Sequence, residues 1–221
     1  MSNDALETHA KSTSVGQGPF RRVAIILLAA GQATRMGPSG AHKLLAEFDG
    51  IPLVRRMAAI ALESSARAVI LVTGHRRSEI ETAIEGLRLE LVDNPQYLSG
   101  MASSLIAGVS RLQDRAVEGA LVMLADMPGL RSSHLDELIN AFQSSGCDCI
   151  VRAACHGSPG NPVILPKSLY PNIFQLQGDI GARHLIENAS LPVIQVEIGE
   201  AALLDLDTPE SVVEAGGIIK N

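Results

Sequence analysis

Short, continuously apolar runs alternate along the chain with stretches in which apolar residues recur every three or four positions. The clearest run is 23–28, Val-Ala-Ile-Ile-Leu-Leu, which contains no polar residue. A run of this length suits a strand of a parallel sheet that is covered by helices on both faces. The same reasoning predicts strands at 23–28, 68–72, 89–92, 120–124, 162–165 and 193–196.

The stretches between these runs have the spacing of amphipathic helices. Helices are predicted from 52 onward, through Ile80 and Ile84, over 103–112, through Leu135, Leu138 and Ile139, over 180–187, and from Thr208-Pro209 onward. Strands of about five residues that alternate with helices of about ten to fifteen indicate βαβ units. The predicted fold class is therefore α/β, a three-layer architecture with a mostly parallel sheet and helices on both faces.

The beginning of the chain differs from the rest. Residues 1–20 are polar and rich in Ser, Thr and Gly, which predicts a disordered tail. Residues 21–221 contain no internal repeat and no low-complexity segment, so we expect them to form a single domain.

Composition narrows the class of protein. The 221 residues carry 18 basic and 24 acidic side chains, a formal net charge of −6, without a basic tract, which argues against a general nucleic-acid binder. The longest apolar run, 23–30, is far shorter than the roughly 20 residues of a membrane helix, and residues 1–18 lack the apolar region of a signal peptide. Three cysteines are too few for a disulfide framework. We expect a cytoplasmic protein that binds neither membrane nor nucleic acid.

Polar residues that could bind a ligand follow four of the predicted strands. The first strand leads into 31–43, the second into Gly74-His75, the third into Asp93-Asn94 and the fourth into Asp126. In open parallel sheets ligands bind outside the carboxyl ends of the strands. These segments should therefore meet at one edge of the sheet and form the binding site.

The segment 31–37, Gly-Gln-Ala-Thr-Arg-Met-Gly, has the features of a phosphate-binding loop. Its glycines let backbone N–H groups turn toward an anion, and Arg35 and Lys43 add positive charge. The segment is neither a Walker A loop nor a G-x-G-x-x-G dinucleotide loop. It is expected to bind a triphosphate; the alternative is a surface loop whose glycines only turn the chain.

Two aspartates are candidate metal ligands. Asp126 follows a buried strand, and Mg²⁺ needs few protein oxygens because it keeps several waters. Asp207 could be a second ligand. The alternatives are, for Asp126, a helix N-cap or a turn aspartate before Pro128 and, for Asp207 with Thr208, a cap of the last helix.

Further candidates lie in the second half of the chain and before the third helix. Arg183, with Asp179, could face a second anionic substrate, although a capping Asp with a solvated Arg is the plainer interpretation. Residues 100–104 could offer helix N-terminal donors to a ribose or phosphate, or could be simple N-capping. The cysteine spacing does not favour zinc, and no catalytic triad is visible.

Several segments together resemble a known family. Leu28-Ala-Ala-Gly31, Arg35-Met-Gly37 and Lys43-Leu-Leu45 resemble the signature of nucleotidyltransferases that activate small phosphorylated substrates, and the resemblance spans about 22–215. This signature is common to the MobA-like superfamily. The chain resembles one branch of it, the molybdenum cofactor cytidylyltransferases, in the further segments 72–75, 94–95, 99–104, 126–128, 160–162, 178–183 and 205–210. Five residues separate Gly37 from Lys43, somewhat more than in the shortest family loops.

The resemblance implies a Rossmann-like nucleotidyltransferase fold and transfer of CMP from CTP to the terminal phosphate of the molybdopterin-type molybdenum cofactor, with release of pyrophosphate. Arg35, Lys43 and Asp126 would be catalytic, with Mg²⁺ on Asp126 and Asp207. The nucleotide would be bound by Leu28, Ala29, Ala30, Gly31, Arg35, Lys43, Gly74, Asn94, Ser103 and Asp126, and the second substrate by Asn161, Asp179 and Arg183.

Three alternatives remain open. The chain could transfer GMP to the same cofactor, although Ala29-Ala30 stands where the guanylyl branch typically has Gly-Gly. It could transfer CMP to another phosphorylated small molecule, such as a sugar or polyol phosphate. It could also carry the finished cofactor without catalysing a reaction. Whether the chain is an enzyme or a carrier, we expect transient contact with a hydroxylase of the xanthine dehydrogenase type.

Overall fold

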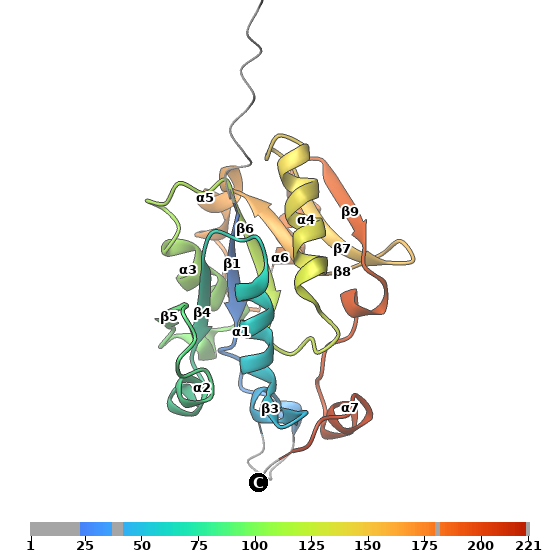
Figure 1. Ribbon diagram of the computed structural model, residues 1–221. Helices are drawn as coiled ribbons and strands as arrows, with labels where there is room; N and C mark the ends of the chain where they lie inside the picture. The colour runs from blue at the N-terminus through green and yellow to red at the C-terminus, as the bar shows by residue number, and fades with distance from the viewer. Residues whose placement is uncertain (1–22, 37–41, 180–181, 220–221) are drawn as a thin grey trace, which may run out of the picture.

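One seven-stranded sheet forms the centre of the molecule in the computed structural model, which describes residues 23–36, 42–179 and 182–219 (Figure 1). The predictions for residues 1–20, Gly37 and Ile180-Gly181 lie outside the described residues. The strands are ordered β5-β4-β1-β6-β8-β7-β9. They comprise β1 (Val23–Leu28), β4 (Val69–Thr73), β5 (Glu90–Asp93), β6 (Gly119–Leu124), β7 (Ile150–Cys155), β8 (Ser158–Pro166) and β9 (Val193–Glu197).

The sheet is mostly parallel, as the sequence predicts. Strand β1 pairs in parallel with β4 on one side and β6 on the other, so that Leu27 lies opposite Leu71 and Met123. Only β8 among the strands of this sheet runs antiparallel to its neighbours β6 and β7. The carboxyl ends of β1, β4, β5 and β6 therefore meet at one edge.

Helices cover both faces and complete the three-layer α/β architecture (Figure 1). The α-helices are α1 (Leu53–Glu63), α2 (Arg77–Ala83), α3 (Met101–Ser110), α4 (Ser132–Ser144), α5 (Tyr170–Ile173), α6 (Ala182–Asn188) and α7 (Pro209–Glu214). The short 3₁₀ helices are η1 (Thr34–Met36), η2 (Lys43–Leu45), η3 (Tyr97–Ser99), η4 (Lys167–Leu169) and η5 (Gly199–Ala202). No helix in the described ranges is long and apolar enough to cross a membrane.

Two apolar cores lie on opposite faces of the sheet, and β1 contributes to both. Ile25 and Leu27 pack with α1 and α4, whereas Ala24 and Ile26 pack with α3, α5 and α6. The reason is that successive side chains of a strand point to opposite faces. All four side chains are fully buried, which explains why this strand has no polar position.

Helix α3 lies unusually close to β1. A Cβ atom added at Gly108 would lie 2.5 Å from Cγ2 of Ile26, so only glycine permits this packing. This contact, near the C-terminal end of α3, fixes how closely the helix packs against β1.

Four elements were not predicted from the sequence. The sequence did not predict β7, because Arg152 and two alanines interrupt its apolar pattern, yet it pairs with both β8 and β9. It also did not predict the two-residue strands β2 (Glu47–Phe48) and β3 (Ile51–Pro52), or the four-residue helix α5. These pieces are too short for periodicity to be visible and are stabilised by packing.

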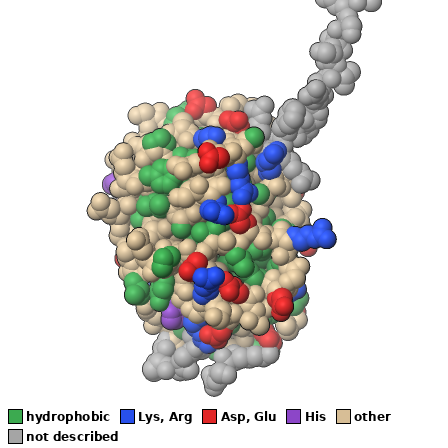
Figure 2. All heavy atoms as spheres, turned by 90° about the vertical axis from the view of Figure 1, so that its left-hand side faces the viewer, with side chains coloured by type: hydrophobic (Ala, Val, Ile, Leu, Met, Phe, Trp, Pro, Cys, Tyr) green, Lys and Arg blue, Asp and Glu red, His purple; other side chains and the backbone are tan. Residues whose placement is uncertain are grey.

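Charged side chains of both signs are interspersed on the face that carries β5 (Figure 2). Glu90 of β5 pairs with both Arg111 and Arg115, and Arg77 pairs with Asp93 at 2.8 Å. Positive charge on this face is thus largely matched by nearby carboxylates.

Candidate active site

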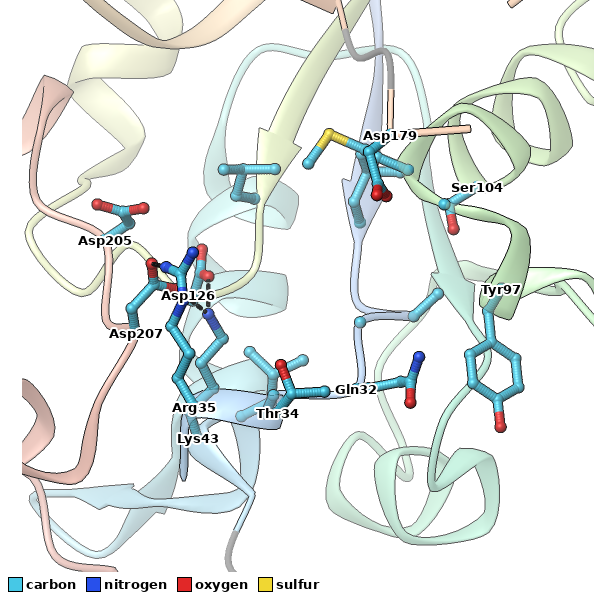
Figure 3. Close-up of a pocket in the computed structure, with 18 of the residues that line it drawn as sticks. Gln32, Thr34, Arg35, Lys43, Tyr97, Ser104, Asp126, Asp179, Asp205 and Asp207 are labelled. Carbon is cyan, nitrogen blue, oxygen red and sulfur yellow. Dashed lines mark hydrogen bonds and ion pairs between the residues drawn. The ribbon is translucent and has the colours of Figure 1, made fainter. Parts of the chain in front are cut away.

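A cavity of about 620 Å³ opens at the carboxyl ends of the parallel strands (Figure 3). Its walls come from the segment after β1, from η2, from η3 and the start of α3, from the end of β6, and from the segments before α6 and α7. The lining residues are Leu28, Ala30, Gly31, Gln32, Ala33, Thr34, Arg35, Lys43, Leu44, Tyr97, Leu98, Gly100, Met101, Ser104, Leu124, Asp126, Asp179, Asp205 and Asp207. The structure thus brings together residues that the sequence placed at one edge.

A charged cluster forms one end of this cavity. The ammonium Nζ of Lys43 lies 2.5 Å from Oδ2 of Asp126 and 3.0 Å from Oδ1 of Asp207. The Arg35 guanidinium donates to the other carboxylate oxygen of Asp207. The side chains of Lys43 and Asp126 are each 14% exposed, so their charges are screened little by water.

The environment shifts the pKa values of Lys43, Asp126 and Asp207. Burial lowers the pKa of Lys43, but the two carboxylates outweigh it and raise that pKa above its ordinary value. Burial raises the pKa of Asp126 because it disfavours the carboxylate, and Lys43 opposes this only in part. The hydrogen bond from Lys43 lowers the pKa of Asp207. Lys43 and Asp207 are consequently charged at neutral pH.

The structure separates the metal-ligand and capping interpretations of the two aspartates. Thr208, not Asp207, is the N-cap of α7, in a reciprocal capping box with Ser211. Asp126 lies outside α4, whose N-cap position is Arg131. Both carboxylates are therefore available to the cavity.

The donor set fits a hard divalent cation such as Mg²⁺. Oδ1 of Asp126 is buried and has no hydrogen-bond partner among the described residues, an oxygen that a cation could satisfy. The described residues contain no group of three or more His, Cys, Asp or Glu placed to hold a metal. One or two carboxylates completed by substrate phosphates are the usual protein ligands of Mg²⁺.

The other end of the cavity carries fewer charges. Asp179 and Ser104 lie there, away from the cluster, and Thr34 and Gln32 lie between Lys43 and Tyr97 (Figure 3). The N–H of Ala102 donates to the carbonyl of Gly178 at 3.1 Å, which holds the segment bearing Asp179 against the start of α3.

Several predicted nucleotide-binding residues do not line the cavity but support its wall. Asn94 is buried and its amide donates to the hydroxyls of Ser103 and Ser104, at 2.8 and 2.9 Å. Gly74 leaves space for Tyr97 and Ala30, since an added Cβ would lie 2.7 Å and 2.9 Å from their Cβ atoms. Ala29 is buried in the core.

Two predicted second-substrate residues lie away from the cavity. The side chain of Arg183 in α6 is 84% exposed and pairs with Glu187 one turn later, which is the solvated arrangement considered as its alternative. Asn161 lies in β8 and is not part of the cavity lining.

Sequence reasoning missed several lining residues. Asp205 was a visible candidate, because it lies two positions before Asp207 in the same acidic segment. Nothing in the sequence indicated that Gln32, Tyr97 and Leu98 line the cavity, because an amide, a phenol and an exposed leucine are common in loops. His42, which does not line the cavity but is buried next to Lys43 in the chain, was also missed.

Comparison with known proteins identifies relatives over most of the chain. Residues 25–193 match the family described as the MobA-like NTP transferase domain. The molybdenum cofactor cytidylyltransferase of Escherichia coli (strain K12) is 26% identical over 191 residues, which cover 86% of this chain and 93% of that protein.

One further relative matches over part of its length, and one solved structure is similar in fold. The bifunctional protein GlmU of Clavibacter sepedonicus is 30% identical over 145 residues, 65% of this chain but 29% of that protein, so this chain spans less than a third of that relative. The crystal structure of the Mycobacterium sp. strain JC1 homolog of Mycobacterium tuberculosis rv0371c superimposes with a TM-score of 0.75 at 25% identity. That superposition covers 88% of this chain and 95% of the other.

Proposed function

The chain belongs to the MobA-like NTP transferase family, and from this premise we propose that it transfers CMP from CTP to the terminal phosphate of the molybdopterin-type molybdenum cofactor. Nucleotidyl transfer is the activity of the family. The choice of CTP and of the molybdenum cofactor is supported by the full-length similarity to the E. coli cytidylyltransferase. The observation that carries the proposal is the cluster of Lys43, Asp126 and Asp207 at one end of a cavity large enough for a nucleotide.

The reaction joins two anions that repel each other, and the charged residues of the cavity would reduce this repulsion. A phosphate oxygen of the acceptor attacks the α-phosphorus of CTP, the bond between the α-phosphorus and the bridging oxygen breaks, and pyrophosphate leaves. The attacking phosphate is already ionised, so no strong general base is needed. Arg35 and Lys43 provide the positive charge that binds the triphosphate and stabilises the leaving group.

Asp126 and Asp207 would hold Mg²⁺, which when bound neutralises charge on the α-phosphate and on pyrophosphate. Asp126 contributes its unpartnered Oδ1, and Asp207 a carboxylate that Lys43 and Arg35 already hold ionised. Gly31 offers its backbone N–H to the triphosphate. We assign the acceptor to the end of the cavity that carries Asp179; Arg183 could contribute only after its ion pair with Glu187 opens.

Substitution of Asp126 tests whether the chain is an enzyme or a carrier. Asp126→Asn removes the charge with little change in volume, and we expect kcat/KM for pyrophosphate release to fall by about 100-fold, as for loss of one stabilising group. Asp49→Asn is the matched control, because the Asp49 side chain is 92% exposed and does not line the cavity. Unchanged pyrophosphate release in Asp126→Asn would instead favour the non-catalytic carrier.

Competition between CTP and GTP tests the choice of nucleotide. With both at equal concentration, Mg²⁺ present and the molybdenum cofactor as acceptor, we expect the dinucleotide product to contain cytosine in large excess. Equal incorporation would contradict the assignment to CTP. Turnover of a sugar phosphate, but not of the molybdenum cofactor, would contradict the assignment of the acceptor.

Two further expectations remain proposals. We propose that the protein acts in the cytoplasm, which its buried, unoxidised Cys149 and Cys155 suit. Contact with a hydroxylase of the xanthine dehydrogenase type rests on the family resemblance and would be tested by co-purification in the cofactor-loaded state.

A further inference from the structure

A buried histidine connects two segments of the proposed triphosphate site, the loop that begins at Gly31 and the segment that carries Lys43. His42 is 3% exposed and directly precedes Lys43. Its Nε2 lies 3.2 Å from the carbonyl oxygen of Gly31, and the N–H of Leu44 donates to its Nδ1 at 3.3 Å. One imidazole thus bonds the residue that opens the glycine loop and the residue that follows Lys43.

These two bonds fix the tautomer of the ring. A backbone N–H can only donate, so Nδ1 of His42 must be the acceptor and cannot carry a proton. The proton of the neutral ring is then on Nε2, where it donates to Gly31. Protonation of Nδ1 would break the bond to Leu44.

The surroundings of His42 favour the same neutral form. Its ring stacks on His75 with centroids 5.7 Å apart. The basic side chains near the ring are those of Lys43, His75 and Arg76. The acidic side chain that interacts electrostatically with it is Glu79 of α2. Burial, with these cations, lowers the pKa of His42 from 6.5 to about 4.

The bond to Gly31 also orients a carbonyl. A carbonyl oxygen bonded to a buried imidazole is directed at that ring and not at a phosphate in the cavity. Without this bond, a partial negative charge would be free to turn toward the triphosphate, and Lys43 would lose one constraint on its backbone.

We propose that His42 is a positioning residue for the nucleotide: as a neutral imidazole it holds the Gly31 carbonyl and the Leu44 amide, and so sets the glycine loop and Lys43 in register for a triphosphate. The inference rests on the proposed function, since it deepens the role of the same site. It concerns binding of the nucleoside triphosphate and predicts a larger change in KM for the nucleotide than in kcat.

Two substitutions separate the hydrogen bonds from the volume of the ring. His42→Leu fills similar space but removes both bonds, and we expect the Kd of CTP, measured by calorimetry, to rise about tenfold. His42→Gln can donate and accept with one amide, and we expect it to restore affinity to within about threefold of wild type. KM for CTP should follow the same order while kcat changes less.

His134→Leu is the matched control. His134 is also buried, but it lies in α4 and does not line the cavity, and its Nδ1 has no partner among the described residues. We expect CTP affinity to be unchanged in this variant. An equal loss in His42→Leu and His134→Leu would overturn the inference, because burial of any histidine would then suffice.

Nitrogen NMR of the labelled imidazoles provides a readout that does not depend on turnover. We expect the His42 signal, assigned by its loss in His42→Gln, to show the neutral Nε2–H tautomer from pH 8 down to about pH 5. Titration near 6.5, or a proton on Nδ1, would overturn the inference even if His42→Leu does not fold. Failure of the wild-type protein to bind any nucleoside triphosphate would overturn the proposed function itself, whereas wild-type affinity in His42→Leu would overturn only the role of His42.

Discussion

Lys43 lies between two carboxylates that we assign to a divalent cation. Its ammonium is within hydrogen-bond distance of both Asp126 and Asp207, and the pair of carboxylates holds its pKa above the ordinary value. The Lys43 ammonium thus pairs with one oxygen of each carboxylate, Oδ2 of Asp126 and Oδ1 of Asp207. A triphosphate offers Lys43 other anionic partners, so binding of nucleotide and binding of the cation should favour each other.

Replacing Lys43 therefore has opposite effects on metal and nucleotide. In Lys43→Met the carboxylates lose their competing cation, and we expect the affinity for Mn²⁺ without nucleotide to rise by at least about tenfold. The expected size follows because two unit charges about 4 Å apart interact by about 4 kcal/mol at an effective dielectric constant of 20. Electron paramagnetic resonance of free Mn²⁺ measures this, and CTP affinity should fall in the same variant.

The control for this experiment is Lys167→Met, whose ammonium is exposed and contacts only a backbone carbonyl at 3.4 Å among its described hydrogen bonds. It should bind Mn²⁺ as the wild type does. If Lys43→Met bound Mn²⁺ no more tightly than this control, Asp126 and Asp207 would not form the cation site.

At the scale of elements, the start of α3 is joined to the segment before α6. Gly100 has φ +105°, and a Cβ there would lie 2.3 Å from both the carbonyl carbon and the oxygen of Gly178. The neighbouring bond from Ala102 to Gly178 depends on this close approach. Asp179, at the proposed acceptor end of the cavity, is thus positioned by backbone contact with α3.

Gly100→Ala should disrupt this junction. We expect the free energy of unfolding to fall by about 3 kcal/mol, about 1 from the backbone strain of a positive φ and about 2 from the clash. Gly86→Ala is the matched control, because Gly86 has φ +83° but nothing within 4 Å of an added Cβ, and it should cost about 1 kcal/mol. Denaturant unfolding followed by circular dichroism measures both; equal losses would show that the contact with Gly178 contributes nothing.

At the scale of the whole molecule, both apolar cores depend on the same strands. Ile26 belongs to one core and Ile25 to the other, although they are adjacent in β1. Loss of either helical layer would expose the central strand. We therefore propose that residues 21–221 fold as one cooperative domain.

Calorimetry of the full chain should show one unfolding transition, with equal calorimetric and van't Hoff enthalpies. Deletion of residues 1–20 should leave the midpoint unchanged, because the polar composition of this segment predicts a disordered tail. Two transitions, or a marked loss of stability in the truncated chain, would contradict the single-domain proposal.

The sequence by itself determined the elements whose pattern is local. Apolar periodicity predicted β1, β4, β6, α1 and α4, because a strand or helix that is buried on a given face must repeat apolar residues with its own period. It also placed Gly31, Lys43 and Asp126 at one edge of the sheet, because the carboxyl ends of parallel strands share that edge.

Only the tertiary structure decided which of these side chains meet. Lys43 is 83 residues from Asp126 and 164 from Asp207, and no local pattern encodes a contact across such separations. The fold assigned the capping role to Thr208, left Arg183 in solvent and enclosed His42, each of which the sequence left open or did not indicate. The physical reason is that periodicity records whether a position is buried, whereas the partners of a buried or charged group are set by the packing of elements far apart in the chain.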